Sequence, residues 1–262
     1  MFGMYKFKGM KTLIITVAGT ATRFNQDTET DTLKCLYYKG EPRYSLLYQI
    51  LDKSRDFDKY IIVGGYLFGK LINFVEEFLS EFRPKIELVY NSYYKTYGSG
   101  YSLLKGIEAI TDNCGEVVFV EGDLFYDAYS FKRVLDTSRD TITVNSEFIT
   151  SQKAVALYAD MRGYIHYLYD TQHHELCISE PFQAIYNSAQ IWKFLSLEKL
   201  RSVIASLTPV QLQGTNLEII QGYFGDISLD MLELVPIKIW VNCNTVSDYN
   251  MVYSLIKDEV IK

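Results

Sequence analysis

A short loop of small residues near the N-terminus could bind an anion. The loop directly follows a β-branched apolar run and consists of Ala18, Gly19, Thr20, Ala21 and Thr22. At the carboxyl end of a strand, such a loop lets backbone N–H groups come close to phosphate oxygens. The next residue, Arg23, adds a planar, permanently charged group that can hold a phosphate through two parallel hydrogen bonds. The loop therefore predicts a phosphate site.

A second cation follows this loop. Lys34 lies eleven residues after Arg23, inside the segment Thr32–Leu36. Either feature alone is weak, because a small-residue loop is usually only a turn and an isolated lysine is usually a solvated surface charge. Together, the loop and the two cations at the carboxyl end of one strand favour a phosphate site.

An acidic residue marks the end of a later strand. Asp123 follows the apolar run Val117–Glu121 and one glycine. An acid in this position lies in the crevice where doubly wound sheets bind ligands. Mg²⁺ usually combines one or two carboxylates with phosphate oxygens and water. Asp123 could instead only cap the next segment, since Asp after Gly is common in turns, but we favour the metal role.

These residues need strands to position them. Short apolar runs predict strands at Thr12–Ala18, Tyr60–Val63, Ile86–Tyr90 and Val117–Glu121. Apolar residues at helical spacing predict helices at Ser45–Leu51, Leu71–Phe82 and Gly100–Ile110. Such alternation of strand and helix is typical of a parallel, doubly wound sheet.

The second half has a different pattern. Strands are predicted at Asp140–Asn145, Lys153–Ala159, Tyr164–Tyr169 and Leu234–Val241. Helices are predicted at Gln183–Leu195, Leu197–Ser206 and Ser247–Lys257. We therefore expect one α/β domain over residues 1–262, with a nucleotide-binding half at about 12–135 and an acceptor-binding half at about 136–262. The expected fold is a Rossmann-like, doubly wound, mostly parallel mixed sheet with helices on both faces and an antiparallel acceptor-binding subdomain.

The composition excludes several classes of protein. Hydrophobic residues make up 48% of the chain and charged residues 22%, so a full core is expected rather than disorder. The net charge of -6, without a basic run, argues against a nucleic-acid partner. No signal peptide or membrane-spanning run is evident, and the four scattered cysteines fit reduced thiols. We expect a cytoplasmic protein with no membrane partner, and a homodimer remains open.

Two segments resemble a known family. Ala18–Phe24 and Leu33–Leu36 are similar to the signature of nucleotidyltransferases of the sugar-1-phosphate and phosphocholine type, roughly A-G-x-G-T-R-[FL] and then P-K-x-L. Arg23 and Lys34 match the pattern, whereas Ala21 replaces its second Gly and Leu33 replaces its Pro. Ala21 is expected to fit only if its backbone φ is negative.

Three later segments match the family in the same order. Their ranges are Tyr97–Leu103, Glu121–Phe125 and Trp240–Thr245, so the resemblance extends from about Leu13 to about Ile256. The resemblance implies that Gly98, Ser99 and Gly100 lie near the base. It also implies that Asp123 and Asn242 hold Mg²⁺. Asn244 could replace Asn242, or both asparagines could be turn residues, and Asp248 is expected to cap the closing helix.

The signals for an acceptor site are weaker. Lys153 could pair with an acceptor phosphate, although such a lysine is more often solvated. Glu180 and Asn187 flank a predicted strand-to-helix region and are candidate acceptor contacts. The adjacent His173 and His174 have no third ligand at metal spacing and are given no role.

The resemblance implies transfer of a nucleotidyl group. The acceptor's phosphate would attack the α-phosphorus of an NTP, and pyrophosphate would leave. The short, tyrosine-rich acceptor half resembles that of cytidylyltransferases that activate phosphocholine and related small phosphates. This resemblance implies CTP and a small phosphorylated metabolite, in precursor synthesis for surface (capsular) polysaccharide or lipid head groups. Uridylyl or other sugar-1-phosphate transfer is the alternative.

Two other readings stay open. A GT-A glycosyltransferase would bind a finished nucleotide sugar, typically through an Asp-x-Asp motif, and would leave Arg23 and Lys34 without a purpose. A catalytically inactive nucleotide-binding subunit would explain the departures at Leu33 and Asn242. The retained Arg23, Lys34 and Asp123 argue against it.

Overall fold

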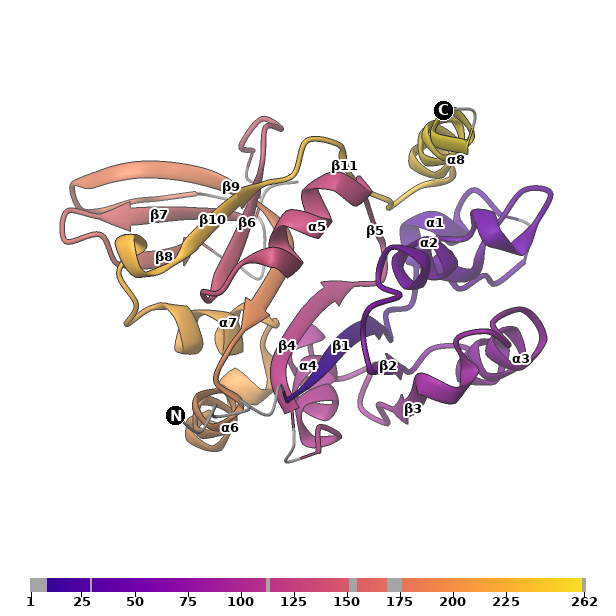
Figure 1. The fold of residues 1–262 in the computed structure, drawn as a ribbon, viewed down its shortest axis with the longest axis horizontal. Helices are drawn as coiled ribbons and strands as arrows, with labels where there is room; N and C mark the ends of the chain where they lie inside the picture. The colour runs from indigo at the N-terminus through magenta and orange to yellow at the C-terminus, as the bar shows by residue number, and fades with distance from the viewer. Residues whose placement is uncertain (1–8, 29, 112–113, 151–154, 169–175, 261–262) are drawn as a thin grey trace, which may run out of the picture.

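The computed structural model describes residues 9–28, 30–111, 114–150, 155–168 and 176–260. A sheet with both parallel and antiparallel strands forms its centre, and helices cover the two faces of this sheet (Figure 1). This is the α/β architecture that the sequence predicts. None of the helices in the described part of the chain combines the length and apolar character that a bilayer crossing requires.

The first half builds the parallel part of the sheet. The central strand β1 (Met10–Val17) pairs in parallel with β2 (Lys59–Gly64) on one side and with β4 (Cys114–Glu121) on the other. The next strand, β3 (Ile86–Tyr90), extends the sheet beyond β2. All four strands were predicted from their apolar runs, and the prediction is confirmed.

Alternate residues of β1 point into different hydrophobic clusters. Leu13 and Ile15 belong to a cluster with helices α2 (Leu46–Lys53), α3 (Phe68–Phe78), α5 (Ala128–Asp136) and α8 (Val246–Val260). Ile14 belongs to a second cluster, with α4 (Ser99–Glu108), α6 (Leu197–Ser206) and α7 (Leu217–Phe224). The strand is therefore covered on both faces, which explains its continuous apolar sequence.

The second half adds antiparallel strands around one long strand. This strand, β9 (Phe182–Phe194), pairs antiparallel with β4, β6 (Thr141–Asn145) and β7 (Ala156–Asp160). Two further strands complete this region: β8 (Ile165–Leu168) pairs with β7, and β10 (Glu233–Pro236) pairs in parallel with β6.

The predicted helix at Gln183–Leu195 is wrong, because this segment is β9. Its apolar residues fit a helical spacing, but neighbouring side chains point into opposite clusters: Ile191 into the first and Trp192 into the second. Ladders with β4 and β6 on its two sides decide the conformation.

The predicted late strand Leu234–Val241 is divided in two. Its first part is β10, and its end forms β11 (Trp240–Asn242), which leaves the main sheet and pairs antiparallel with β5 (Leu124–Tyr126). Asn242 lies opposite Leu124 in this ladder, and the N–H of Cys243 donates to the carbonyl of Asp123 over 2.8 Å. The short ribbon thus joins the end of β4 to the late segment.

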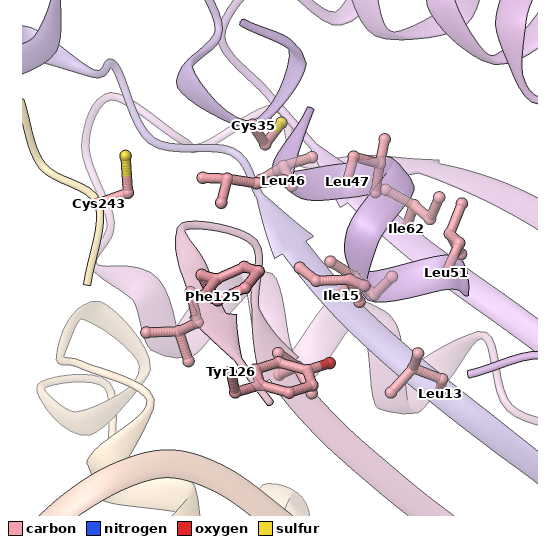
Figure 2. Close-up of a cluster of buried hydrophobic side chains, with 14 of the residues drawn as sticks. Leu13, Ile15, Cys35, Leu46, Leu47, Leu51, Ile62, Phe125, Tyr126 and Cys243 are labelled. Carbon is pink, nitrogen blue, oxygen red and sulfur yellow. The ribbon is translucent and has the colours of Figure 1, made fainter. Parts of the chain in front are cut away.

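Two buried cysteines anchor the polar segments beside them. Cys35 and Cys243 belong to the same hydrophobic cluster as Leu46 and Phe125 (Figure 2). Burial raises the pKa of both thiols, for Cys243 to about 12, so these thiols are neutral at physiological pH. Each cysteine adjoins a polar candidate residue, Lys34 or Asn242, and holds its backbone against the core.

Candidate active site

Lys34 and Asp123 form an ion pair at the carboxyl edge of the sheet. The ammonium of Lys34 lies 2.6 Å from Oδ2 of Asp123, and both side chains are about four-fifths buried. The other carboxylate oxygen, Oδ1, is buried and has no hydrogen-bond partner among the described residues. A buried carboxylate oxygen without a partner is costly. This atom can therefore accept a ligand.

Asn244 joins the two predicted cations. Its Oδ1 accepts hydrogen bonds from Nη2 of Arg23 over 2.9 Å and from Nζ of Lys34 over 3.2 Å. Asn242 lies one contact further away, because its Oδ1 accepts from Nδ2 of Asn244 over 2.9 Å. Of the two asparagines considered from the sequence, Asn244 is the one that touches both cations.

A capping box fixes the backbone beside Asn244. The N–H groups of Asn244 and Thr245 donate to Oδ2 of Asp248 over 2.9 and 2.8 Å. In return, the N–H of Asp248 donates to Oγ1 of Thr245 over 3.1 Å. This reciprocal pattern starts helix α8. The prediction that Asp248 caps the closing helix is confirmed.

The expected negative φ at Ala21 is wrong. Ala21 has φ 52° and ψ 34°, in the left-handed region, immediately before the short helix α1 (Thr22–Asn25). The chain must reverse there to place Arg23 on α1. A residue with a Cβ pays roughly 1–2 kcal/mol for this conformation. The structure thus explains why the resembling family has glycine at this position.

Leu33, the other departure from the family pattern, is accommodated easily. It has an extended backbone with φ -83° and is 3% exposed within the first hydrophobic cluster. The leucine therefore contributes to the core directly before Lys34.

A cavity lies beside the small-residue loop. It has a volume of about 300 Å³ and is lined by Thr20, Thr22, Asn25, Gln26, Asp31 and Tyr66. The hydroxyls of Thr20 and Thr22 lie 3.0 Å apart. The lining thus combines hydroxyls, amides, one carboxyl group and one tyrosine ring, next to Arg23 in the sequence.

The turn at residues 98–100 packs against another loop. The N–H groups of Gly98 and Gly100 donate to the carbonyls of Gln213 and Gly214 over 3.0 and 3.2 Å. A Cβ on Gly98 would lie 2.2 Å from the oxygen of Gly214. Close backbone packing therefore requires glycine here, and the two N–H groups already have partners.

Ser99 starts a chain of polar contacts that ends at β4. Its Oγ accepts from the N–H of Asn216 over 3.0 Å, and Nδ2 of Asn216 donates to Oε1 of Glu121. Burial, and next the negative charge of Asp123, raise the pKa of Glu121 to about 7. These contacts tie the turn at residues 98–100 to the end of β4.

Glu121 received no role from the sequence. It ends the apolar run Val117–Glu121 and begins the family-like segment Glu121–Phe125, and neither pattern gives it a role. The available signal was the spacing of two acids at the end of a buried strand, separated by one glycine.

Two of the three predicted acceptor residues, Glu180 and Asn187, lie in the described part of the chain. Lys153 lies outside the described residues. Oε1 of Glu180 accepts from the hydroxyl of Tyr158 over 2.7 Å, on the β7 side of the antiparallel extension. Asn187 is 5% exposed on β9 and donates to the carbonyl of Glu147 over 3.3 Å, while its Oδ1 has no partner among the described residues.

Within the described part of the chain, no group of three or more His, Cys, Asp and Glu side chains is placed to hold a metal ion. A cation bound at Asp123 would therefore need further oxygens from amides, water or a bound phosphate. Mg²⁺ is a cation that accepts such mixed oxygen ligands.

The fold is similar to those of three solved structures. The inositol-1-phosphate CTP transferase from T. maritima superposes with a TM-score of 0.69 at 14% identity, over 95% of this chain and 97% of that one. A putative glucose-1-phosphate thymidylyltransferase from Bacillus anthracis gives 0.69 at 20%, over 95% and 96%. The CTP:phosphocholine cytidylyltransferase from Streptococcus pneumoniae gives 0.60 at 18%, over 94% and 99%. The Rossmann-like fold expected from the sequence is confirmed.

The chain belongs to the family described as "Domain of unknown function (DUF6564)", which matches residues 30–256. No curated protein matches the sequence. The family match contains Lys34, Asp123 and Asn244, and it begins after Arg23.

Proposed function

We propose that the protein is a nucleotidyltransferase that joins an NMP group from an NTP to a small phosphorylated metabolite and releases pyrophosphate. The observation that carries this proposal is one connected set of contacts: Asn244 binds Arg23 and Lys34, and Lys34 binds Asp123. Arg23, Lys34 and Asp123 are of the types that transfer of a phosphoryl-like group requires.

Arg23 and the amides of the small-residue loop would bind the β- and γ-phosphates. Arg23 is exposed beside the polar cavity, so its guanidinium can reach a ligand there. Lys34 would turn toward the α-phosphate and stabilise the charge that develops on it. Asp123 provides the counter-charge for this ammonium and keeps it in place.

An oxygen of the acceptor's phosphate would attack the α-phosphorus of the NTP in line. The bond between the α-phosphorus and the bridging oxygen then breaks, and pyrophosphate leaves with that oxygen. The acceptor phosphate is already an anion at neutral pH, so no covalent enzyme intermediate is required. The role of the protein is to position the reactants and to neutralise charge.

Asp123 fits a divalent cation, because its buried Oδ1 has no hydrogen-bond partner among the residues that the structure describes. Asn244 or Asn242 would supply an amide oxygen nearby. Mg²⁺ bound there would neutralise negative charge on the phosphates of the nucleotide. Gly98, Ser99 and Gly100 would act on the base side mainly by holding the backbone of the 213–216 loop.

We further propose CTP as the donor, in the cytoplasm, where NTPs are made, with precursor synthesis for surface polysaccharide or lipid head groups as the context. Two of the similar structures are a CTP transferase and a CTP:phosphocholine cytidylyltransferase, which supports this choice. Uridylyl or other sugar-1-phosphate transfer is the alternative. Within one domain, the parallel half would bind nucleotide and the antiparallel half the acceptor, through Glu180, Asn187 and Lys153.

One observation favours a GT-A glycosyltransferase as a second candidate. Glu121 and Asp123 are acids separated by one residue, which resembles the acid-x-acid metal motif of that class. The contacts of Lys34 and Arg23 with the same site favour the nucleotidyltransferase.

The test is a screen for pyrophosphate release. Purified protein with Mg²⁺ is incubated with each of five NTPs and with phosphorylated choline, ethanolamine, polyols, sugars and amino acids. We expect pyrophosphate to form only with one matched NTP and acceptor, and not with Asp123→Asn. Cleavage of nucleotide sugars without any pyrophosphate from NTPs would favour the glycosyltransferase. Nucleotide binding with no turnover would indicate an inactive subunit.

A further inference from the structure

Asn187 has a buried side-chain oxygen that lacks a hydrogen-bond donor in the described part of the chain. The residue is 5% exposed on β9, and the atom without a partner is Oδ1. At the other end of the amide, Nδ2 donates to the carbonyl of Glu147 over 3.3 Å. A backbone carbonyl can only accept, so this contact fixes which end of the amide is which. The free position is therefore an acceptor, and a ligand that binds there must donate a hydrogen bond.

Asn187 lies toward the edge of the sheet that holds the candidate site. Along β9, the antiparallel ladder with β4 reaches Ile191 opposite Val120. Asn187 precedes Ile191 by four residues. Because the two strands run in opposite directions, Asn187 lies beyond the carboxyl end of β4. The indole N–H of Trp240 donates to the carbonyl of Ala189 over 2.8 Å and ties this part of β9 to β11.

The hydrogen bonds beside Asn187 involve amides and backbone groups. In the sheet it lies between Asn145 and Ala156. The amide of Asn145 has partners at both ends: its Oδ1 accepts from the N–H of Glu147, and its Nδ2 donates to the carbonyl of Ser188, each over 2.9 Å. A buried ammonium group would need a counter-charge, whereas a neutral hydroxyl needs only an acceptor. These surroundings therefore favour a hydroxyl as the donor.

A ligand can reach the buried Oδ1 only if a neighbouring segment moves. Residues 146–150 form a loop after β6 without regular secondary structure. Its Glu147 is held by Asn145, whereas the next residue, Phe148, is 91% exposed and so is not anchored in the core. Movement of the loop beyond Glu147 would permit access while the Asn187 amide keeps its orientation.

We propose that Asn187 determines the chemical class of the acceptor. Its Oδ1 accepts a hydrogen bond from a hydroxyl group of the bound metabolite, so the protein takes the phosphate of a polyol or sugar rather than phosphocholine. A quaternary ammonium group has neither N–H nor O–H and would leave Oδ1 buried without a donor. A site built to bind a hydroxyl discriminates strongly against analogues that lack it. The inference rests on the proposed function for the premise that the acceptor carries a phosphate.

Three matched phosphates test the proposal, because they differ only in the group at the end of a two-carbon chain. They are 2-hydroxyethyl phosphate, phosphoethanolamine and phosphocholine. Isothermal titration calorimetry of the full chain is made with Mg²⁺ and a CTP analogue whose α,β-methylene bridge prevents turnover. We expect the hydroxyl compound to bind about tenfold to a hundredfold more tightly than phosphocholine. Equal affinities, or tightest binding of either ammonium compound, would overturn the proposal, as would a folded wild type that does not bind the hydroxyl compound.

Asn187→Leu removes both polar atoms of the amide at similar size. It should weaken binding of the hydroxyl compound about tenfold or more and bring the three affinities close together. Asn91→Leu is the matched control, since Asn91 is also buried and both ends of its amide have partners, Ser102 and Tyr93. It should leave the ratio of the affinities unchanged.

Circular dichroism melts identify any variant that fails to fold, and the wild-type ratio then decides the question. In a folded Asn187→Leu, the wild-type preference would show that Asn187 does not contact the acceptor.

The acceptor class and the reaction can fail separately. A preference for the hydroxyl compound that depends on Asn187, in a protein that releases no pyrophosphate, would keep the acceptor class and reject nucleotidyl transfer. Pyrophosphate release with phosphocholine as the best acceptor would keep the reaction and reject the hydroxyl contact.

Discussion

The two halves of the sheet differ in how their candidate residues are brought together. In the parallel half, Lys34 and Asp123 come from the regions that follow β1 and β4, which are neighbours in the sheet, and they meet within 2.6 Å. In the antiparallel half, Glu180 bonds to Tyr158 and Asn187 bonds to Glu147, without contact between the two. Parallel strands place their carboxyl ends at one edge, so local sequence signals there add up to a site. Neighbouring antiparallel strands have their carboxyl ends at opposite edges of the sheet, so they do not bring such residues together.

The largest expected effect is in the parallel half. Asp123→Asn removes a negative charge and leaves Lys34 without its counter-ion. We expect kcat for pyrophosphate release to fall about a thousandfold, which corresponds to several kcal/mol of lost charge stabilisation. The Mg²⁺ requirement should rise at the same time. Wild-type rates in a Mg²⁺ titration of Asp123→Asn would show that the site does not lie in the parallel half, and the difference between the two halves would then not hold.

Lys34→Met should have the next largest effect, because it should lower kcat and raise the affinity for Mn²⁺. Loss of the ammonium should lower kcat roughly a hundredfold or more, because its charge is matched to the α-phosphate during transfer. The same change frees Asp123 from its ion pair, so Mn²⁺ should bind more tightly in the absence of nucleotide.

The two measurements on Lys34→Met are independent. Slower turnover with unchanged Mn²⁺ affinity would show that the ion pair does not compete with the cation. Weaker NTP binding with an unchanged kcat would make Lys34 a binding residue only.

The sequence predicted the parallel half well for physical reasons. Buried parallel strands read as uninterrupted apolar runs, and each functional residue lies a few positions beyond one of them. Glu121 ends such a run, and its hydrogen bond with Asn216, 95 residues away, is visible only in the structure. Which of the two asparagines, Asn242 or Asn244, contacts Arg23 and Lys34 depends on the pairing of β5 with β11, which the local sequence does not specify.

The antiparallel half was predicted less well because its longest strand has distant partners. Local spacing favoured a helix at Gln183–Leu195, whereas pairing of β9 with β4 and β6 decided the outcome. The predicted contact residue Asn187 was thought to lie on a helix and instead sits in the sheet. The pairing of β9 buries Asn187, and its Oδ1 has no hydrogen-bond partner among the described residues. Neither feature can be predicted from the local sequence.

Asn187→Ala tests whether the antiparallel half binds the acceptor after all. If Oδ1 of Asn187 accepts a hydrogen bond from the acceptor, we expect its KM to rise about tenfold, the value of one hydrogen bond of roughly 1.4 kcal/mol. The KM for NTP should stay unchanged. Steady-state kinetics with both substrates varied provide the measurement. Equal changes in both KM values would point to a general loosening of β9 rather than to an acceptor contact.

The smallest expected effect concerns stability and returns to the parallel half. Ala21 occupies the left-handed region with φ 52°, a conformation that costs a residue with a Cβ roughly 1–2 kcal/mol. Glycine pays no such cost but has a more flexible unfolded chain, which opposes the gain by about 0.4–1 kcal/mol. Ala21→Gly should therefore raise the free energy of unfolding by up to about 1 kcal/mol. Urea unfolding of the wild type and the variant measures the difference.

The matched control is Ala18→Gly, because Ala18 is buried at the end of β1 and is not among the residues with positive φ. This substitution should destabilise the protein. Destabilisation by both substitutions to a similar degree would show that the strain at Ala21 is relieved in solution, and that the loop beside Arg23 is held differently from the structure described.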